Sequence, residues 1–169
     1  MLDKTMRKVA DCLTAGVISD THGMLSPEAM KMLIGVDLII HAGDIDTPAV
    51  LDELHRIAPV VAVRGNMDRG RWAVSLNPVE AVEIGECLLY VLHDVNQLDI
   101  DPAAAGMSAV IHGHTHRPSD AMQNGVRFLN PGSAAQPRHN APPSIMKLHV
   151  CGKDMRPEFI DLKYRLSEK

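Results

Sequence analysis

The chain has 169 residues, of which 46% are hydrophobic and 22% charged, and its formal net charge is -4. This composition is typical of one soluble globular domain, and the negative charge gives no general attraction to nucleic acid or anionic membranes. The three cysteines, Cys12, Cys87 and Cys151, are far apart and form no CxxC pair. They argue against a disulfide framework and against a thiolate zinc site, and they favour a cytoplasmic location.

No targeting or membrane segment is expected. No apolar run approaches the roughly 18 residues of a membrane span. Residues 1–12 lack the apolar stretch of a signal peptide, so we interpret them as a short N-terminal extension. Residues 13–169 are then a single domain.

The first half of the chain alternates apolar strand-like runs with helices. Ser26 and Thr47 are each followed by proline, which favours a helix start at both places. In chain order we expect a strand at 13–19, a helix from 27 to about 33, a strand at 37–42, a helix from 48 to about 56 and a strand at 59–63. This alternation predicts a parallel sheet with right-handed crossovers.

The second half has the character of hairpins. Asn124-Gly125 is a strong two-residue hairpin signal, and Gly85-Glu86 and Gly152-Lys153 mark two further turns. The expected strands are 79–84, 87–93, 109–111, 119–123, 126–129, 145–150 and 157–162. The proline-rich segment 130–144 is expected to be a surface loop. Together the two halves predict two β-sheets packed face to face with helices outside.

Polar side chains that can bind metals follow five of the predicted strands. The segments are Ser19-Asp20-Thr21-His22-Gly23, Gly43-Asp44, Gly65-Asn66-Met67-Asp68, His93 and Gly113-His114-Thr115-His116. Ligands collect outside the carboxyl ends of strands in α/β sheets. In an extended segment residues i and i+2 point to the same side, so each DxH or HxH pair is expected to converge on one point.

The donor set suits a pair of metals. It contains two carboxylates, one amide oxygen and four imidazoles, which is too many for one tetrahedral ion. It fits two divalent cations about 3.5–4 Å apart that share a bridging carboxylate and a bridging water. Mixed nitrogen and oxygen donors without thiolate favour transition metals over calcium or magnesium; manganese is our first expectation, with zinc, iron, nickel or cobalt as alternatives.

The order DxH, GD, GN, H, GHTH resembles the calcineurin-like metallophosphoesterase superfamily. Within it, the phrases SDTHG, HAGD and NPGS resemble the small, cap-less bacterial and archaeal phosphodiesterase branch, and the resemblance covers nearly the whole chain from Thr14 onward. It implies the metallo-dependent phosphatase fold, an α/β sandwich of four layers in which helices flank the two packed sheets.

The resemblance also implies roles for individual residues. One metal would be held by Asp20, His22 and His116, the other by Asn66, His93 and His114, with Asp44 as the bridge. Asp44, Asn66 and His93 would then be the catalytic set. Two positions depart from the family: Asp94 stands where a glycine usually follows the histidine, and Met67 where many members carry a histidine that can protonate a leaving group.

The function implied is hydrolysis of a small phosphate ester, most simply a phosphodiester, by in-line attack of a metal-bridging hydroxide. No stable nucleic-acid or membrane binding is expected, and homo-oligomerisation is left open. One alternative is a catalytically weak or inactive protein-interaction scaffold, as in the retromer subunit that shares the fold. A nuclease is the other, although this chain is short and acidic. All seven candidate ligand positions carry side chains with good donor atoms, which favours an enzyme over a scaffold.

Several further residues have two interpretations. Arg138 is either a substrate-phosphate ligand or a solvated loop arginine, and Trp72 either lines a pocket or packs. His41 and His112 are interpreted as core histidines, with contact to a metal ligand as the alternative. Asp68 either contacts a metal ligand or caps a loop. His55 and His149 receive no function.

Overall fold

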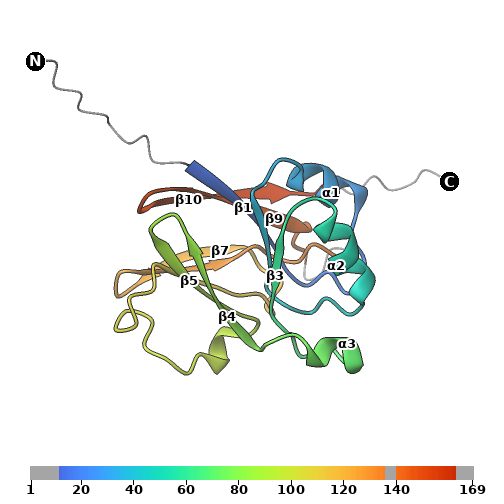
Figure 1. Cartoon of the computed structure of the whole chain (residues 1–169), viewed down its shortest axis with the longest axis horizontal. Helices are drawn as coiled ribbons and strands as arrows, with labels where there is room; N and C mark the ends of the chain where they lie inside the picture. The colour runs from blue at the N-terminus through green and yellow to red at the C-terminus, as the bar shows by residue number, and fades with distance from the viewer. Residues whose placement is uncertain (1–11, 136–139, 163–169) are drawn as a thin grey trace, which may run out of the picture.

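The computed structural model describes residues 12–135 and 140–162. In these ranges ten strands form two five-stranded sheets. The two sheets lie one against the other (Figure 1). The fold class expected from the sequence is confirmed. None of the helices within the described ranges is long and apolar enough to span a bilayer.

The first sheet has the strand order β10-β9-β1-β2-β3. Its strands are β1 (Cys12–Ile18), β2 (Leu38–His41), β3 (Val60–Ala62), β9 (Ser144–Cys151) and β10 (Asp154–Asp161). β1, β2 and β3 are parallel neighbours, and β9 and β10 add antiparallel strands beside β1. The predicted parallel core of the first half is therefore present.

Two helices connect the parallel strands and cover the outer face of this sheet (Figure 1). α1 (Pro27–Leu33) begins where the Ser26 side chain accepts a hydrogen bond from the Ala29 N–H at 3.1 Å. α2 (Pro48–His55) follows Thr47, whose side chain makes no capping bond. Leu33 and Leu54 are fully buried against the sheet, which anchors both helices.

The second sheet has the order β4-β5-β6-β8-β7. Its strands are β4 (Val79–Ile84), β5 (Cys87–Leu92), β6 (Ala109–Ile111), β7 (Ser119–Gln123) and β8 (Val126–Asn130). β5, β6 and β8 run parallel, and the predicted hairpins β4–β5 and β7–β8 form the two edges. Every residue of the edge strand β7 is exposed.

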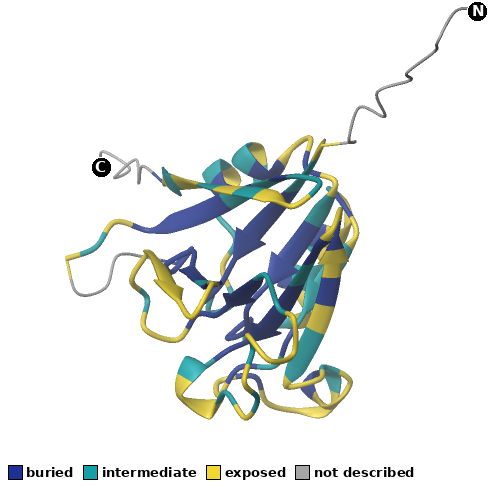
Figure 2. Ribbon diagram, turned by 90° about the vertical axis from the view of Figure 1, so that its left-hand side faces the viewer, coloured by how far each residue is buried: buried dark blue, intermediate teal, exposed yellow. Residues whose placement is uncertain are grey.

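The main core lies between the two sheets. Side chains such as Val17 and Ile40 from the first sheet pack against Leu89 and Ile111 from the second, all without solvent exposure. Figure 2 shows the result, with buried strands inside and exposed residues on loops and outer edges. The outer face of the second sheet is covered by apolar residues of segment 95–107, which contains the short 3-10 helix η1 (Val95–Gln97), so this fourth layer is thinner than expected.

Other features also differ from the sequence-based expectations. Residues 131–135, expected in a surface loop, are buried. The short helix α3 (Arg71–Val74) and η1 were not predicted, because neither is long enough to produce an apolar period. In addition, Cys12 and Cys151 form a disulfide bond across 139 residues of sequence. They lie directly opposite each other in the β1–β9 pair, with Cα atoms 4.3 Å apart. The expectation of no disulfide was wrong, and the cysteines no longer support a reducing compartment.

Candidate metal centre

The loops that follow strands of both sheets meet at one end of the sandwich. Asp20 N–H donates to the Gly43 carbonyl at 3.0 Å, which joins the loops after β1 and β2. His114 N–H donates to Asp20 Oδ2 at 3.1 Å, which joins the loop after β6 to the loop after β1. The predicted ligands, which come from positions 20 to 116, therefore lie in one cluster.

The first group of ligand atoms comprises Asp20, His22 and His116. Asp20 Oδ1 lies 3.1 Å from His116 Nε2 and 4.0 Å from His22 Nε2, and the two imidazole nitrogens are 3.3 Å apart. Asp20 is fully buried, and its Oδ1 atom has no aligned hydrogen-bond partner in the described residues. Three electron-rich atoms this close, one of them buried without a donor, fit a shared cation.

The second group comprises Asp44, Asn66, His93 and His114. His93 Nε2 lies 3.3 Å from Asp44 Oδ2 and 3.1 Å from Asn66 Oδ1. His114 Nδ1 lies 3.2 Å from the same Asn66 oxygen. The ligand atoms of Asp20, Asp44 and His93 all lie within 4.8 Å of one another, so Asp20 is near both groups. The donor set fits a second cation beside the first.

Neighbouring acceptors orient the imidazoles toward these two points. His93 Nδ1–H donates to the Ala42 carbonyl at 2.7 Å, so Nε2 is the nitrogen that faces Asp44 and Asn66. The His22 Nδ1 atom lies 3.2 Å from Asp46 Oδ2, which likewise leaves Nε2 facing the centre. Such partners fix the tautomer and the ring direction of metal-binding histidines.

The backbone at five of the seven candidate ligands is left-handed and not extended. The φ angles are 53° at Asp20, 46° at His22, 57° at Asp44, 66° at His114 and 59° at His116. We expected an extended DxH or HxH segment to bring its two side chains to one point. That expectation was wrong, because these segments are not extended. Asp20 and His22 do converge, through tight turns, whereas His114 and His116 belong to different groups.

Asp68 holds the loop that carries Asp44. Its carboxylate accepts hydrogen bonds from the N–H groups of Asp44, Ile45, Asp46 and Gly65, at 2.7–3.1 Å. This arrangement selects the loop cap from the two interpretations of Asp68. Gly65 is required for the same packing, because a Cβ atom there would overlap the Asp44 backbone and carboxylate.

The ionisation of the central residues follows their contacts. Burial opposes ionisation of Asp44, but hydrogen bonds from His93 and from the Met67 N–H prevail and lower its pKa. Burial acts to lower the pKa of His93, but the hydrogen bond to Asp44 and the nearby carboxylates prevail and raise it. A metal at these atoms would have to displace a proton that Asp44 and His93 otherwise share.

His41 and His112 are core histidines, as interpreted. His41 is fully buried; its Nδ1 accepts from the Gly43 N–H at 3.2 Å and its Nε2 lies 3.0 Å from Thr21 Oγ1. Burial lowers the pKa of His41 to about 3, so the ring is neutral. Burial also lowers the pKa of His112, whose Nδ1 lies 3.3 Å from Asn130 Nδ2.

The remaining predicted residues are placed as follows. Arg138 lies outside the described residues. Trp72 packs against the cluster under α1 and α2, which favours the packing role. Met67 is 44% exposed, and its N–H donates to Asp44 Oδ1 at 2.8 Å. The His149 ring lies between Thr14 and Glu158 on the first sheet.

A hollow of about 260 Å³ opens directly beside the second group. It is lined by Asn66, His93 and His114 together with Arg64, Gly65, Pro78, Asp94 and Gln97. Sequence reasoning did not single out Arg64 or Gln97. A basic residue directly before a strand-end Gly-Asn was the available signal for Arg64.

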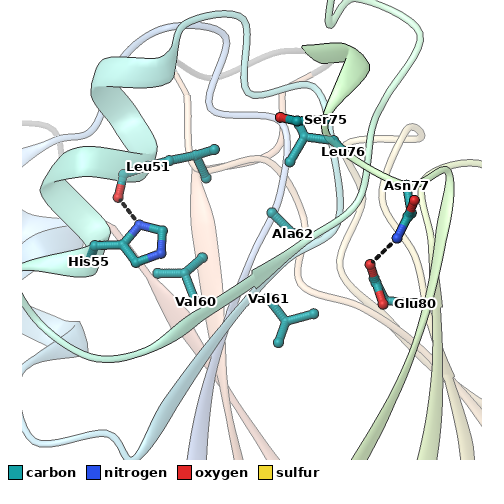
Figure 3. A pocket seen from close by; sticks show the side chains of 9 residues that line it. All are labelled: Leu51, His55, Val60, Val61, Ala62, Ser75, Leu76, Asn77 and Glu80. Atoms are coloured by element: carbon teal, nitrogen blue, oxygen red, sulfur yellow. Dashed lines mark hydrogen bonds between the residues drawn. The ribbon is translucent and has the colours of Figure 1, made fainter. Parts of the chain in front are cut away.

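A second hollow of about 300 Å³ lies away from the centre, between α2, β3 and the segment before β4 (Figure 3). Val60, Val61 and Ala62 line it, and the His55 ring beside them donates to the Leu51 carbonyl at 2.7 Å. Because that bond lies within α2, the His55 imidazole is engaged in its own helix and supplies no metal site there.

Comparison with known proteins gives consistent matches along the chain. A family model described as the calcineurin-like phosphoesterase superfamily domain matches residues 13–153. A probable metallophosphoesterase of Methanothermobacter thermautotrophicus is 36% identical over 157 residues, covering 86% of this chain and 90% of that protein.

Solved structures share the fold at lower identity. An archaeal phosphodiesterase has a TM-score of 0.69 at 23% identity, covering 88% of this chain and 100% of that one. Vps29 of Entamoeba histolytica in complex with zinc has a TM-score of 0.70 at 24% identity, covering 89% of this chain and 100% of that one.

Proposed function

Because the chain belongs to the calcineurin-like phosphoesterase superfamily, we propose that it is a two-metal phosphodiesterase. The observation that carries the proposal is the convergence of two groups of ligand atoms from loops of both sheets, with a buried, unpartnered Asp20 oxygen near both. The archaeal phosphodiesterase of the same fold supports the choice of a diester over a monoester.

The residues of the chain would act as holders and orienters. Asp20, His22 and His116 would hold one divalent cation and Asn66, His93 and His114 the other, with Asp44 between them. When bound, such a pair lowers the pKa of an attacking water and neutralises charge on the phosphoryl oxygens. Asp46 and the Ala42 carbonyl keep the His22 and His93 rings aimed at the centre.

Manganese is the proposed metal, with zinc, iron, nickel and cobalt as the other candidates. The ligand set consists of imidazole, carboxylate and amide groups and includes no thiolate: Cys12 and Cys151 are bonded to each other, and Cys87 is buried in the core between the sheets. Such a set suits borderline transition metals.

The test combines metal analysis with a substrate panel. The purified protein is stripped with a chelator, reloaded with each metal in turn, and assayed on bis(p-nitrophenyl) phosphate and p-nitrophenyl phosphate. We expect about two metals per chain and faster turnover of the diester. The surface variant Asp120→Asn, at an exposed pair with Arg127, is the control and should behave as the parent. Stoichiometric metal without turnover of either ester would overturn the proposal.

A scaffold is the second candidate, because Vps29 has the same fold. Metal binding does not separate the two candidates, since that Vps29 structure also contains zinc. Turnover separates them. An enzyme loses its turnover when Asp44 is replaced by asparagine, whereas a scaffold has none to lose.

A further inference from the structure

The hollow beside the second ligand group has one positively charged lining residue. Its volume of about 260 Å³ is just below the range of drug-sized ligand sites, so it suits one small polar group. Three of its lining residues, Asn66, His93 and His114, belong to the metal centre. A phosphate ester held at that centre can therefore extend its alcohol part into the hollow.

Arg64 lies two residues beyond the end of β3, directly before Gly65. Its backbone N–H donates to the Asn77 carbonyl at 2.9 Å, which fixes the backbone of this lining residue. No carboxylate of the described residues forms an ion pair with its guanidinium. Arg64 has intermediate solvent exposure and lines the hollow, so its guanidinium can reach a ligand there.

The hollow is also lined by one carboxylate, that of Asp94. This carboxylate interacts with Asn96 and His114. Its Oδ1 accepts from the Asn96 N–H at 3.0 Å and from Asn96 Nδ2 at 2.9 Å, which caps η1. Its Oδ2 lies 3.9 Å from His114 Nε2. The carboxylate therefore faces the imidazole and its own turn, and it leaves the Arg64 charge uncompensated.

We propose that this hollow binds the alcohol side of the substrate and that Arg64 selects alcohols carrying a second anionic group, a carboxylate or a phosphate. The inference rests on the proposed phosphodiesterase function. A guanidinium binds such planar or tetrahedral anions through two parallel N–H donors. Gln97, which also lines the hollow, adds an amide that can form hydrogen bonds with oxygen atoms of the ligand.

The experiment uses two diesters that differ only in charge, methyl 4-carboxyphenyl phosphate and methyl 4-carbamoylphenyl phosphate. The manganese-loaded protein and its Arg64→Gln variant are compared by the ratio of kcat/KM for the two esters. The two esters differ in leaving-group pKa, but this difference affects the parent and the variant equally, so it cancels when their ratios are compared. We expect the ratio to fall about tenfold in Arg64→Gln, as for loss of a partly exposed charged hydrogen bond. Arg64→Lys should keep most of the preference.

Three further measurements keep the inference open to refutation. Arg71→Gln, at the start of α3 and outside the hollow, is the matched control and should leave the ratio unchanged. Binding of the non-hydrolysable 4-carboxybenzylphosphonate and 4-carbamoylbenzylphosphonate, measured by calorimetry, should show the same Arg64-dependent difference without turnover. In the parent protein the preference should also fall as salt is raised, which requires no variant.

The outcomes separate the two proposals. If the parent cleaves both diesters and Arg64→Gln leaves their ratio unchanged, the role of Arg64 is wrong and the phosphodiesterase function stands. If the parent cleaves neither diester with any metal, the phosphodiesterase function fails. A salt-independent preference in the parent would also contradict the role of Arg64.

Discussion

The Asp68 carboxylate receives the backbone N–H of Asp44 at 3.1 Å, together with three further N–H groups of the two loops that meet at the centre. In Asp68→Asn an amide NH₂ would face N–H groups that need an acceptor. We expect the variant to lose about 2–3 kcal/mol of unfolding free energy and to bind metal more weakly, because the Asp44 loop is released. Urea unfolding and metal titration measure both effects.

Asp120→Asn is the control for that experiment, since it removes a carboxylate from an exposed pair with Arg127. We expect its unfolding free energy to change by about 0.5 kcal/mol or less. Equal losses of unfolding free energy in the two variants would mean that the four hydrogen bonds of Asp68 do not stabilise the loop.

Replacement of Asp44 by asparagine tests the bridge. The variant keeps the shape of the side chain but loses the charge that lies 3.3 Å from His93 Nε2. We expect metal content to fall and hydrolysis to be abolished. Asp20→Asn is the matched variant, because Asp20 lies near both groups. If Asp20→Asn loses both metals while Asp44→Asn keeps both and turns over normally, Asp20 is the bridge.

Metal removal should leave the fold intact. The core between the sheets is formed by apolar side chains, and the ligands lie on loops beyond the strand ends. Chelation should therefore remove activity while the far-UV circular dichroism spectrum stays nearly unchanged. Added metal should raise Tm by mass action. Loss of the β-sheet signal on chelation would show that the sandwich depends on the metals.

Met67 occupies the position where many relatives carry a histidine. Without a positioned general acid, which typically contributes about 10²–10⁴-fold, aryl diesters should be cleaved far faster than alkyl diesters. Met67→His places an imidazole on a residue that is 44% exposed and adjoins the centre, and should flatten this dependence. A rate series across leaving groups measures it. A shallow dependence in the parent would mean that another residue already supplies the proton; Asp68 is not a candidate, since backbone N–H groups occupy both its oxygens.

His41 should make the metal-free protein acid-sensitive. Its pKa falls from 6.5 to about 3 on folding, so the unfolded chain binds the extra proton as pH drops below 6.5. The unfolding free energy is therefore unaffected by His41 above that pH and falls progressively toward pH 3, and the loss reaches about 2 kcal/mol at pH 5. We expect His41→Gln to show a smaller loss of unfolding free energy between pH 7 and pH 5. Urea unfolding at both pH values measures this loss. An equal loss in the parent and in His41→Gln would contradict the prediction.

Much of the fold follows from local sequence signals. Ser26 with Pro27 marks the start of α1, Asn124-Gly125 marks the β7–β8 turn, and the apolar run at 109–111 is β6 as predicted. These features depend on neighbours in sequence. The disulfide does not: Cys12 and Cys151 meet only because β9 pairs with β1, a long-range contact that cysteine counting does not predict.

The candidate site likewise has features that local sequence predicts and features that depend on contacts between distant parts of the chain. The candidate ligand residues are predicted from their places after strands, and their proposed grouping is predicted from family resemblance. Their backbone conformation does not, because two-residue periodicity assumes an extended chain and these residues are left-handed. The loop cap at Asp68 and the free charge of Arg64 depend on which N–H groups and carboxylates surround each side chain in space.

The left-handed backbone at the ligands has an evolutionary consequence. An L-residue pays a steric penalty there that glycine avoids, and His22, His114 and His116 all adopt this conformation. Substitutions to glycine at these positions would relieve the backbone while destroying the ligand set. If these histidines hold metals as proposed, selection for chemistry would oppose such substitutions. A lineage freed from that selection can drift toward a more robust sandwich without a reactive centre, which is a physical route from a hydrolase to a binding protein of the same shape.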